Sequence, residues 1–150
     1  MKKFLSILLL LAVCMTGCNE ERVENMNSMQ EKEAVVNIKE ESLSNTGLVL
    51  VVKNETDDCA FEFGNAYSLE MLVDGNWIDV KQLQDVPITA IAHMVLPGES
   101  IEHAVNWERR YGSLPTGDYR LVKRVERVHE DGEGFNNVVG DYYIYVSFSV

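Results

Sequence analysis

Apolar residues recur at every second position through most of residues 34–150, and turn-forming residues interrupt them about every ten residues. This alternation predicts short strands that bury one face. We expect eight strands, with no convincing helix between them, at residues 34–39, 47–53, 67–73, 77–81, 91–96, 100–107, 118–125 and 141–150. Such a series favours a β-sandwich or a barrel. Residues 48–52 are apolar on both faces, which favours a central strand.

The dipeptide Asp74-Gly75 predicts a two-residue hairpin turn, because both central positions of a type I′ turn need positive φ. In the resulting register Met71 lies opposite Ile78 on one face. Trp77 takes the other face of the hairpin.

The dipeptide Pro97-Gly98 predicts a second tight turn, of type II. If this turn closes a hairpin, His93 points outward and His103 inward, on opposite faces of one sheet. The two histidines could not then bind one metal ion, and His129 lies far along the chain. No zinc-site spacing is present, so we expect a surface His93, a satisfied, partly buried His103 and no metal.

Acidic residues outnumber basic residues by 24 to 13, which gives the 150-residue chain a formal net charge of −11. This charge argues against electrostatic binding to nucleic acid or to an anionic membrane surface, because both need clustered Lys and Arg. Apolar residues make up 46% of the chain, enough to build a core, so global disorder is excluded.

The first 18 residues, MKKFLSILLLLAVCMTGC, place two lysines before a short apolar run. The run is too short to span a bilayer and predicts a signal peptide over residues 1–17. Met15-Thr-Gly-Cys18 resembles the lipobox of bacterial lipoproteins. The resemblance implies that Cys18 carries fatty acids such as palmitate and anchors the protein to the extracytoplasmic face of the cell membrane. The alternative is an ordinary secretory signal with Cys18 as an incidental thiol.

Residues 18–33 combine the lipidated cysteine with a polar, acidic stretch that predicts a flexible tether. Loss of two lysines with the signal would leave 11 basic and 24 acidic residues, a net charge of −13. Cys59 would then be the one remaining cysteine, so the domain cannot form an internal disulfide. Cys59 is either a small buried hydrophobe or a free thiol, and its acidic neighbours favour the buried state because they blunt thiol reactivity.

No motif of a known catalytic site is present: we find no serine nucleophile elbow, phosphate-binding glycine loop or HExxH helix. We therefore expect no catalytic residue, no cofactor and no enzyme activity. The acidic, glycine-rich residues 129–134 do not match a calcium-binding EF-hand loop, and a solvated loop is favoured over a calcium site. Residues 128–140 would form the longest loop at this end of the chain, and sandwiches often bind ligands through such loops.

The last predicted strand places Tyr143 and Tyr145 on its outward face, because its apolar residues alternate inward. Such an outward pair could be a recognition surface, since tyrosine supplies rigid contact area with a polar tip. Tyrosines on an exposed sheet face are also ordinary cross-strand partners, and the sequence favours this simpler interpretation.

The segment Leu114-Pro-Thr-Gly-Asp-Tyr119 looks like the tyrosine corner of immunoglobulin-like sandwiches. Residues 35–150 as a whole are similar to a bacterial Ig-like domain family found in small exported lipoproteins. The similarity is carried by Asn54-Glu-Thr56, Phe63-Gly64, Tyr67-Ser-Leu69-Glu70, Trp77 with Val80, Leu96-Pro97-Gly98 and the stretch from Trp107 to Lys123.

The resemblance implies an all-β, immunoglobulin-like antiparallel β-sandwich of about seven or eight strands over residues 34–150. It implies framework roles for Trp77, Trp107, Tyr111 and Tyr119, and it transfers no activity. The function expected from it is a non-catalytic binding or interaction domain for a protein or a cell-wall component. The alternatives are a structural accessory subunit of a cell-envelope complex and an inhibitor of an extracellular enzyme.

Overall fold

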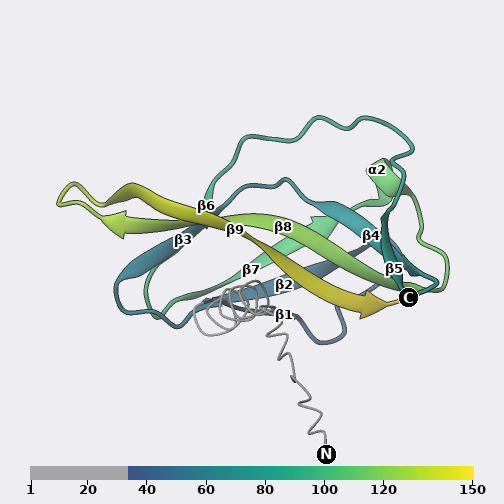
Figure 1. The fold of residues 1–150 in the computed structure, drawn as a ribbon, viewed down its shortest axis with the longest axis horizontal. Helices are drawn as coiled ribbons and strands as arrows, with labels where there is room; N and C mark the ends of the chain where they lie inside the picture. Colours follow the sequence, from purple (N-terminus) through teal and green to yellow (C-terminus); the bar gives the residue numbers. More distant parts are fainter. Residues whose placement is uncertain (1–33) are drawn as a thin grey trace, which may run out of the picture.

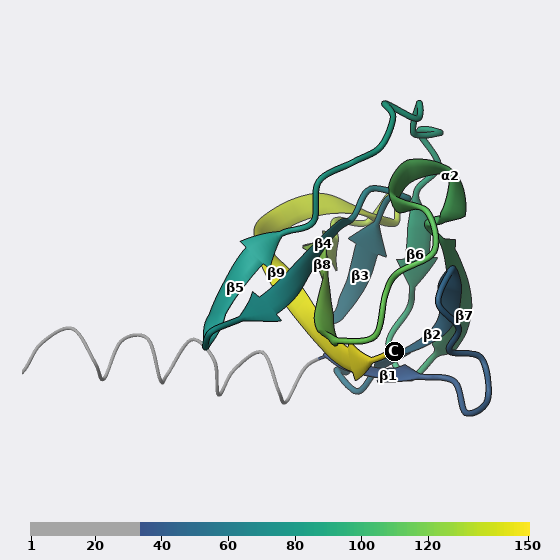
Figure 2. The same ribbon diagram turned by 90° about the vertical axis from the view of Figure 1, so that its right-hand side faces the viewer.

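The computed structural model describes residues 34–150, which form two antiparallel sheets packed face to face (Figures 1 and 2). The predicted signal peptide, Cys18 and the tether lie outside the described residues. The expected immunoglobulin-like β-sandwich is confirmed. Within residues 34–150, no helix has the length and apolar character needed to cross a membrane.

The smaller sheet has three strands in the order β1-β2-β7. Its strands are β1 (Ala34–Ile38), β2 (Gly47–Asn54) and β7 (Ser100–Asn106). The central strand, β2, contains the stretch that is apolar on both faces, as expected. Leu48, Leu50 and Val52 of β2 are buried between the sheets.

The larger sheet has six strands arranged around β8, which is long enough to pair with two strands along one edge. Along that edge β8 pairs with β4 and then with β3, and along the other edge it pairs with β9. Beyond these, β5 pairs with β4 and β6 pairs with β3. The strands are β3 (Cys59–Phe63), β4 (Ser68–Val73), β5 (Asn76–Asp79), β6 (His93–Val95), β8 (Asp118–Glu130) and β9 (Phe135–Ser149).

Two elements, β3 and a short helix, are absent from the elements that the sequence predicts. Strand β3 was not expected, because Cys59, Ala60 and Phe61 are all buried and show no alternation. A short helix, α2 (Glu108–Tyr111), follows β7 directly. Cys59 is fully buried, as expected for a small hydrophobe.

The prediction that residues 128–140 form a loop is wrong. Strands β8 and β9 continue through it as one hairpin and leave only residues 131–134 as the turn, where the Asp131 N–H donates to the Gly134 carbonyl at 3.1 Å. Register shifts after Arg127 and His129 interrupt the alternation, which explains why the strands were not recognised. Figure 1 shows this hairpin extending past the rest of the molecule.

The turn at Pro97-Gly98 forms, with the Glu99 N–H donating to the Leu96 carbonyl at 3.0 Å and Gly98 at φ 74°. It does not close a hairpin within one sheet, because β6 pairs with β3 and β7 pairs with β2. The chain crosses here from the larger sheet to the smaller one. By contrast, Asp74-Gly75 closes the expected hairpin, with Met71 opposite Ile78.

The core lies between the sheets and is rich in aromatic side chains. Trp107 is fully buried, donates its indole N–H to the Asn45 carbonyl at 2.9 Å, and stacks on Phe148. The Tyr119 hydroxyl donates to the Pro115 carbonyl at 3.0 Å, so the expected tyrosine corner is confirmed.

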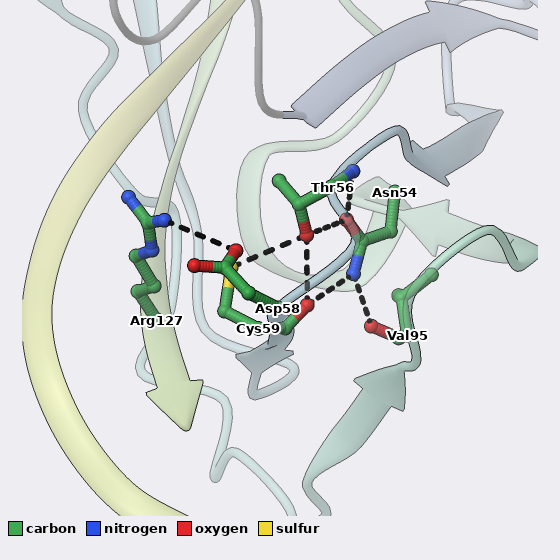
Figure 3. A network of polar contacts seen from close by, with 6 residues as sticks. All are labelled: Asn54, Thr56, Asp58, Cys59, Val95 and Arg127. Carbon is green, nitrogen blue, oxygen red and sulfur yellow. Dashed lines mark hydrogen bonds and ion pairs between the residues drawn. The ribbon is translucent and has the colours of Figure 1, made fainter. Parts of the chain in front are cut away.

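Asn54 ties the two sheets together at the end of β2 (Figure 3). Its side-chain amide donates to the Cys59 carbonyl at 2.8 Å and to the Val95 carbonyl at 2.9 Å, both in the larger sheet. Its side-chain oxygen accepts from the backbone N–H and the hydroxyl of Thr56. The fully buried amide therefore uses both donors and both lone pairs of its oxygen.

We expect Asn54→Ala to lower the free energy of unfolding by about 3 kcal/mol, because two buried carbonyls in different strands lose a donor. Urea unfolding of the full chain measures the change. The control Asn136→Ala removes an exposed asparagine from the β8–β9 hairpin and should change the stability by less than about 0.5 kcal/mol. Equal effects of the two substitutions would contradict the role of Asn54.

Candidate functional site

The outer face of the larger sheet, which points away from the core, carries the two tyrosines singled out in the sequence. Tyr143 and Tyr145 are 50% and 53% exposed. They lie opposite Arg124 and Val122 of β8, which point to the same side of the sheet. The alternation along β9 thus places both rings outward, and their functional role stays a prediction.

Arg120 links this part of the face to β5. Its guanidinium carbon lies 4.6 Å from the centroid of the Trp77 ring and 4.6 Å from that of the Tyr145 ring. Glu70, directly opposite Arg120 on β4, pairs with the guanidinium as well. Two cation–π contacts and an ion pair therefore hold the arginine in one position.

We call Trp77, Arg120, Tyr143 and Tyr145 the aromatic face. These residues come from β5, β8 and β9, and the sheet register brings them together. One side of the Trp77 ring and one side of the Tyr145 ring are occupied by Arg120. The two rings therefore flank the guanidinium and do not form a bare, flat aromatic platform.

Further along β8, Arg124 forms ion pairs at 2.8 Å with Asp141 and at 2.9 Å with Glu126. The hydrogen bond to Asp141 is the main cause that raises the pKa of Arg124. Because the Arg124 and Asp141 side chains are about half exposed, this ion pair adds little stability. The two ion pairs neutralise the positive charge of Arg124 beside Tyr143, so this charged residue next to the aromatic face is already paired.

The residues expected to form the framework divide into two groups. Trp107, Tyr111 and Tyr119 are buried, in or at the edge of the core. Trp77 is half-buried on the outer face and packs against Arg120. The sequence did predict its face from the hairpin register, but it gave no sign of the arginine, which lies on a strand distant in sequence.

His103 is buried and points inward, as expected, but the expected outward position of His93 and the placement of both histidines in one sheet are wrong. The two histidines come from opposite sheets, and their ring centroids lie 4.7 Å apart in the interior. Phe63 contacts both rings, and the His93 Nε2 atom hydrogen-bonds to the Asn65 side-chain oxygen at 2.8 Å. In the described part of the chain, no group of three or more His, Cys, Asp or Glu residues could hold a metal ion.

Lys123 lies beside these histidines and was missed in the sequence. It is fully buried, and its ammonium group donates to the carbonyls of Gly64 and Ala66, to the latter at 3.2 Å. Burial lowers the pKa of Lys123 to about 8. The sequence does contain a sign of its burial: Lys123 occupies the alternate position between Leu121 and Val125, which both point inward.

His103 is held in its neutral form. Burial, together with the nearby positive Lys123 and with His93, lowers its pKa from 6.5 to about 4. A second positive charge beside Lys123 would be costly in this interior. The arrangement therefore excludes a proton from His103 at neutral pH.

Two grooves lie beneath the segment that joins β5 to β6. The larger, about 540 Å³, is bordered by residues 62–66, residues 88–92, Arg124 and Glu126. The smaller, about 290 Å³, lies next to it and includes Tyr67 and Arg110. Among residues 34–150, Phe63 is the one aromatic side chain that borders the larger groove, so the aromatic face offers more rigid contact area than this groove does.

Two packed antiparallel sheets and a tyrosine corner define an immunoglobulin-like domain. Residues 30–136 match the family described as bacterial Ig-like domain, and the chain belongs to that family. No curated protein and no solved structure matches the chain. The family match ends within β9, before Tyr143 and Tyr145.

We expect acid to destabilise the wild-type protein more than the His103→Gln variant. The folded-state pKa of about 4 lies below the ordinary 6.5, so between these values the unfolded chain binds a proton that the folded chain excludes. The stability contributed by neutral His103 is present above about pH 6.5 and is lost as the pH falls toward 4.

Urea unfolding at pH 7 and at pH 5 measures this difference, which should be about 1 kcal/mol. The control His129→Gln changes a histidine outside the cluster and should keep the wild-type pH dependence. If His103→Gln also keeps it, the exclusion of a proton from His103 is wrong.

Proposed function

We propose that this protein is a lipid-anchored, extracytoplasmic lipoprotein whose Ig-like domain is a non-catalytic module that binds another protein through the aromatic face. The signal-peptide pattern and the lipobox-like Met15-Thr-Gly-Cys18 support the anchor and the location. Membership of the bacterial Ig-like domain family supports a role in interaction.

The observation that carries the binding proposal is the placement of Arg120 between Trp77 and Tyr145. Trp, Tyr and Arg are the residues that most often dominate the binding energy of protein interfaces. Here all three are held together before any partner arrives, and Glu70 fixes the arginine further. Binding would therefore cost little side-chain entropy, which is a large part of the usual cost of association.

The same geometry favours a protein partner over a cell-wall glycan. Sugar rings stack on the open faces of aromatic side chains, whereas Trp77 and Tyr145 each place one face against the guanidinium. The half-exposed Tyr143 and Tyr145 combine apolar contact area with a hydroxyl group. A protein surface offers hydrogen-bond partners and apolar groups that match this mixture.

We expect the double variant Tyr143→Ala with Tyr145→Ala to capture at least tenfold less of the partner than the wild type, because two aromatic contacts are lost. Capture from detergent-solubilised membranes, quantified by mass spectrometry, measures the change. The control Leu83→Ala removes an exposed apolar side chain from the segment between β5 and β6 and should leave capture unchanged.

Capture that is equal for the double variant and the wild type contradicts the aromatic face as the binding site. Retention by isolated cell-wall glycan in place of protein contradicts the choice of partner. A stoichiometric envelope complex among the captured proteins would indicate an accessory subunit, and an extracellular enzyme would indicate an inhibitor.

The anchor makes a separate prediction. Cells that express the wild-type chain and receive labelled palmitate should incorporate the label into the protein, and Cys18→Ala should abolish incorporation. Cys59→Ala is the matched control and should keep the label, because Cys59 is buried in the folded domain. Equal labelling of the wild type and Cys18→Ala would exclude lipidation at Cys18.

A further inference from the structure

Strand β9 is an edge of the larger sheet. It pairs with β8 along one side, and no strand of residues 34–150 pairs with its other side. At 15 residues, β9 is the longest strand described. An edge strand presents backbone N–H and C=O groups in the geometry that another strand needs for pairing.

The hydrogen bonds at the end of the β8–β9 ladder show which residues face this outer edge. Gly117 and Val150 exchange both backbone hydrogen bonds, at 3.1 and 3.0 Å. Hydrogen-bonded and non-hydrogen-bonded pairs alternate along an antiparallel ladder, and the register is unbroken from Ser149 to Asp141. The residues that direct their N–H and C=O groups away from β8 are therefore Asp141, Tyr143, Tyr145, Ser147 and Ser149.

This edge lacks the features that normally prevent strand pairing. Between residues 141 and 149 there is no proline, no bulge and one charged residue, Asp141, which is paired with Arg124. The other edge strands are protected. β1, β5 and β6 have only five, four and three residues, and β7 carries the exposed, charged Glu102.

We propose that β9 pairs with β9 of a second copy of this chain, antiparallel, about a two-fold axis at Tyr145. This register places Tyr145 opposite Tyr145 of the second copy, Tyr143 opposite Ser147, and Asp141 opposite Ser149. Each of these residues directs its backbone groups to the outer edge, so each pair forms ladder hydrogen bonds. No like charges lie opposite one another, although the whole chain has a net charge of −11.

The inward-pointing residues also match in this register. Tyr142 lies opposite Phe148 of the second copy, and Ile144 lies opposite Val146. Tyr142 and Ile144 are half-buried in the single copy. Cross-strand pairs of aromatic and β-branched residues stabilise antiparallel sheets, so both half-buried residues gain contacts on pairing.

A two-fold axis of this kind stands perpendicular to the sheet, so corresponding faces of the two copies lie on the same side. Both aromatic faces then point in one direction, and both smaller sheets, where β1 begins, point in the other. The geometry of the pairing is set by the β9 edge, and the pairing goes beyond the proposed binding of another protein.

Cysteine cross-linking in cells that express the full chain tests the pairing. Residues in a hydrogen-bonded antiparallel pair have their Cα atoms about 5.5 Å apart, within the range of a disulfide. Tyr145→Cys should therefore form a disulfide with itself across the two-fold axis. In Tyr143→Cys the two cysteines would be about 14 Å apart, four residues along the strand, and should not react.

The double variant Tyr143→Cys with Ser147→Cys places the two cysteines opposite each other across the axis and restores the cross-link. After mild oxidation, non-reducing gels should show at least tenfold more dimer for Tyr145→Cys and for the double variant than for Tyr143→Cys alone. Cys59 is buried, and the wild type supplies the background. Equal amounts for Tyr145→Cys and Tyr143→Cys would overturn the proposal, as would cross-linking of Tyr145→Cys to a chain of different mass.

A second substitution tests the backbone hydrogen bonds directly. The Ser147 N–H points to the outer edge, so Ser147→Pro in the Tyr145→Cys background leaves the β8 ladder intact and blocks the second copy. The cross-link should fall at least tenfold, whereas Ser147→Ala in the same background should retain it. Undiminished cross-linking of the Ser147→Pro variant, at an equal level of exported protein, would also overturn the proposal.

Discussion

The register between β8 and β9, with its alternation of hydrogen-bonded and non-hydrogen-bonded pairs, determines the buried lysine, the aromatic face and the open edge of the larger sheet. Because Gly117 and Val150 form a hydrogen-bonded pair, the pairing on β8 is fixed along the whole unbroken register. That register sends Lys123 into the interior and Arg120 to the outer face. It also sends the backbone groups of Tyr145 to the open edge. A shift of one residue would exchange the two faces of the strand.

The two faces of β8 each carry a positively charged side chain, Lys123 on the inner face and Arg120 on the outer face, in different surroundings. On the inner face, the Lys123 ammonium contacts two backbone carbonyls and the ring of Phe63 in place of water. Burial, with this charge nearby, lowers the pKa of His103 and keeps a proton off it. On the outer face, Arg120 is only partly buried and keeps its aromatic and carboxylate partners. The buried His103 beside the inner charge therefore makes the interior sensitive to acid, whereas the outer charge fixes the aromatic side chains around it.

The sequence predicts those features that depend on neighbouring residues and does not predict those that depend on where the chain changes sheets. The Asp74-Gly75 turn and the Tyr119 corner are local and were predicted correctly. The Pro97-Gly98 turn is predicted correctly, but local residues do not encode that it joins two sheets, so the predicted outward position of His93 is wrong. The stacking of Arg120 was missed for the same reason, because β5, β8 and β9 meet only in the folded sheet.

The proposed anchor would strengthen the proposed strand pairing. Each backbone hydrogen bond across the β9 edge contributes only about 1 kcal/mol net, and association in solution costs at least about 4 kcal/mol in lost freedom of motion. Tethering of both copies to one membrane surface raises their effective concentration without any new contact. The two-fold axis suits this arrangement, since it leaves both β1 strands on one side and both aromatic faces on the other. Weak pairing across the β9 edge is then sufficient to hold membrane-bound copies together, whereas the same chains would stay separate in dilute solution.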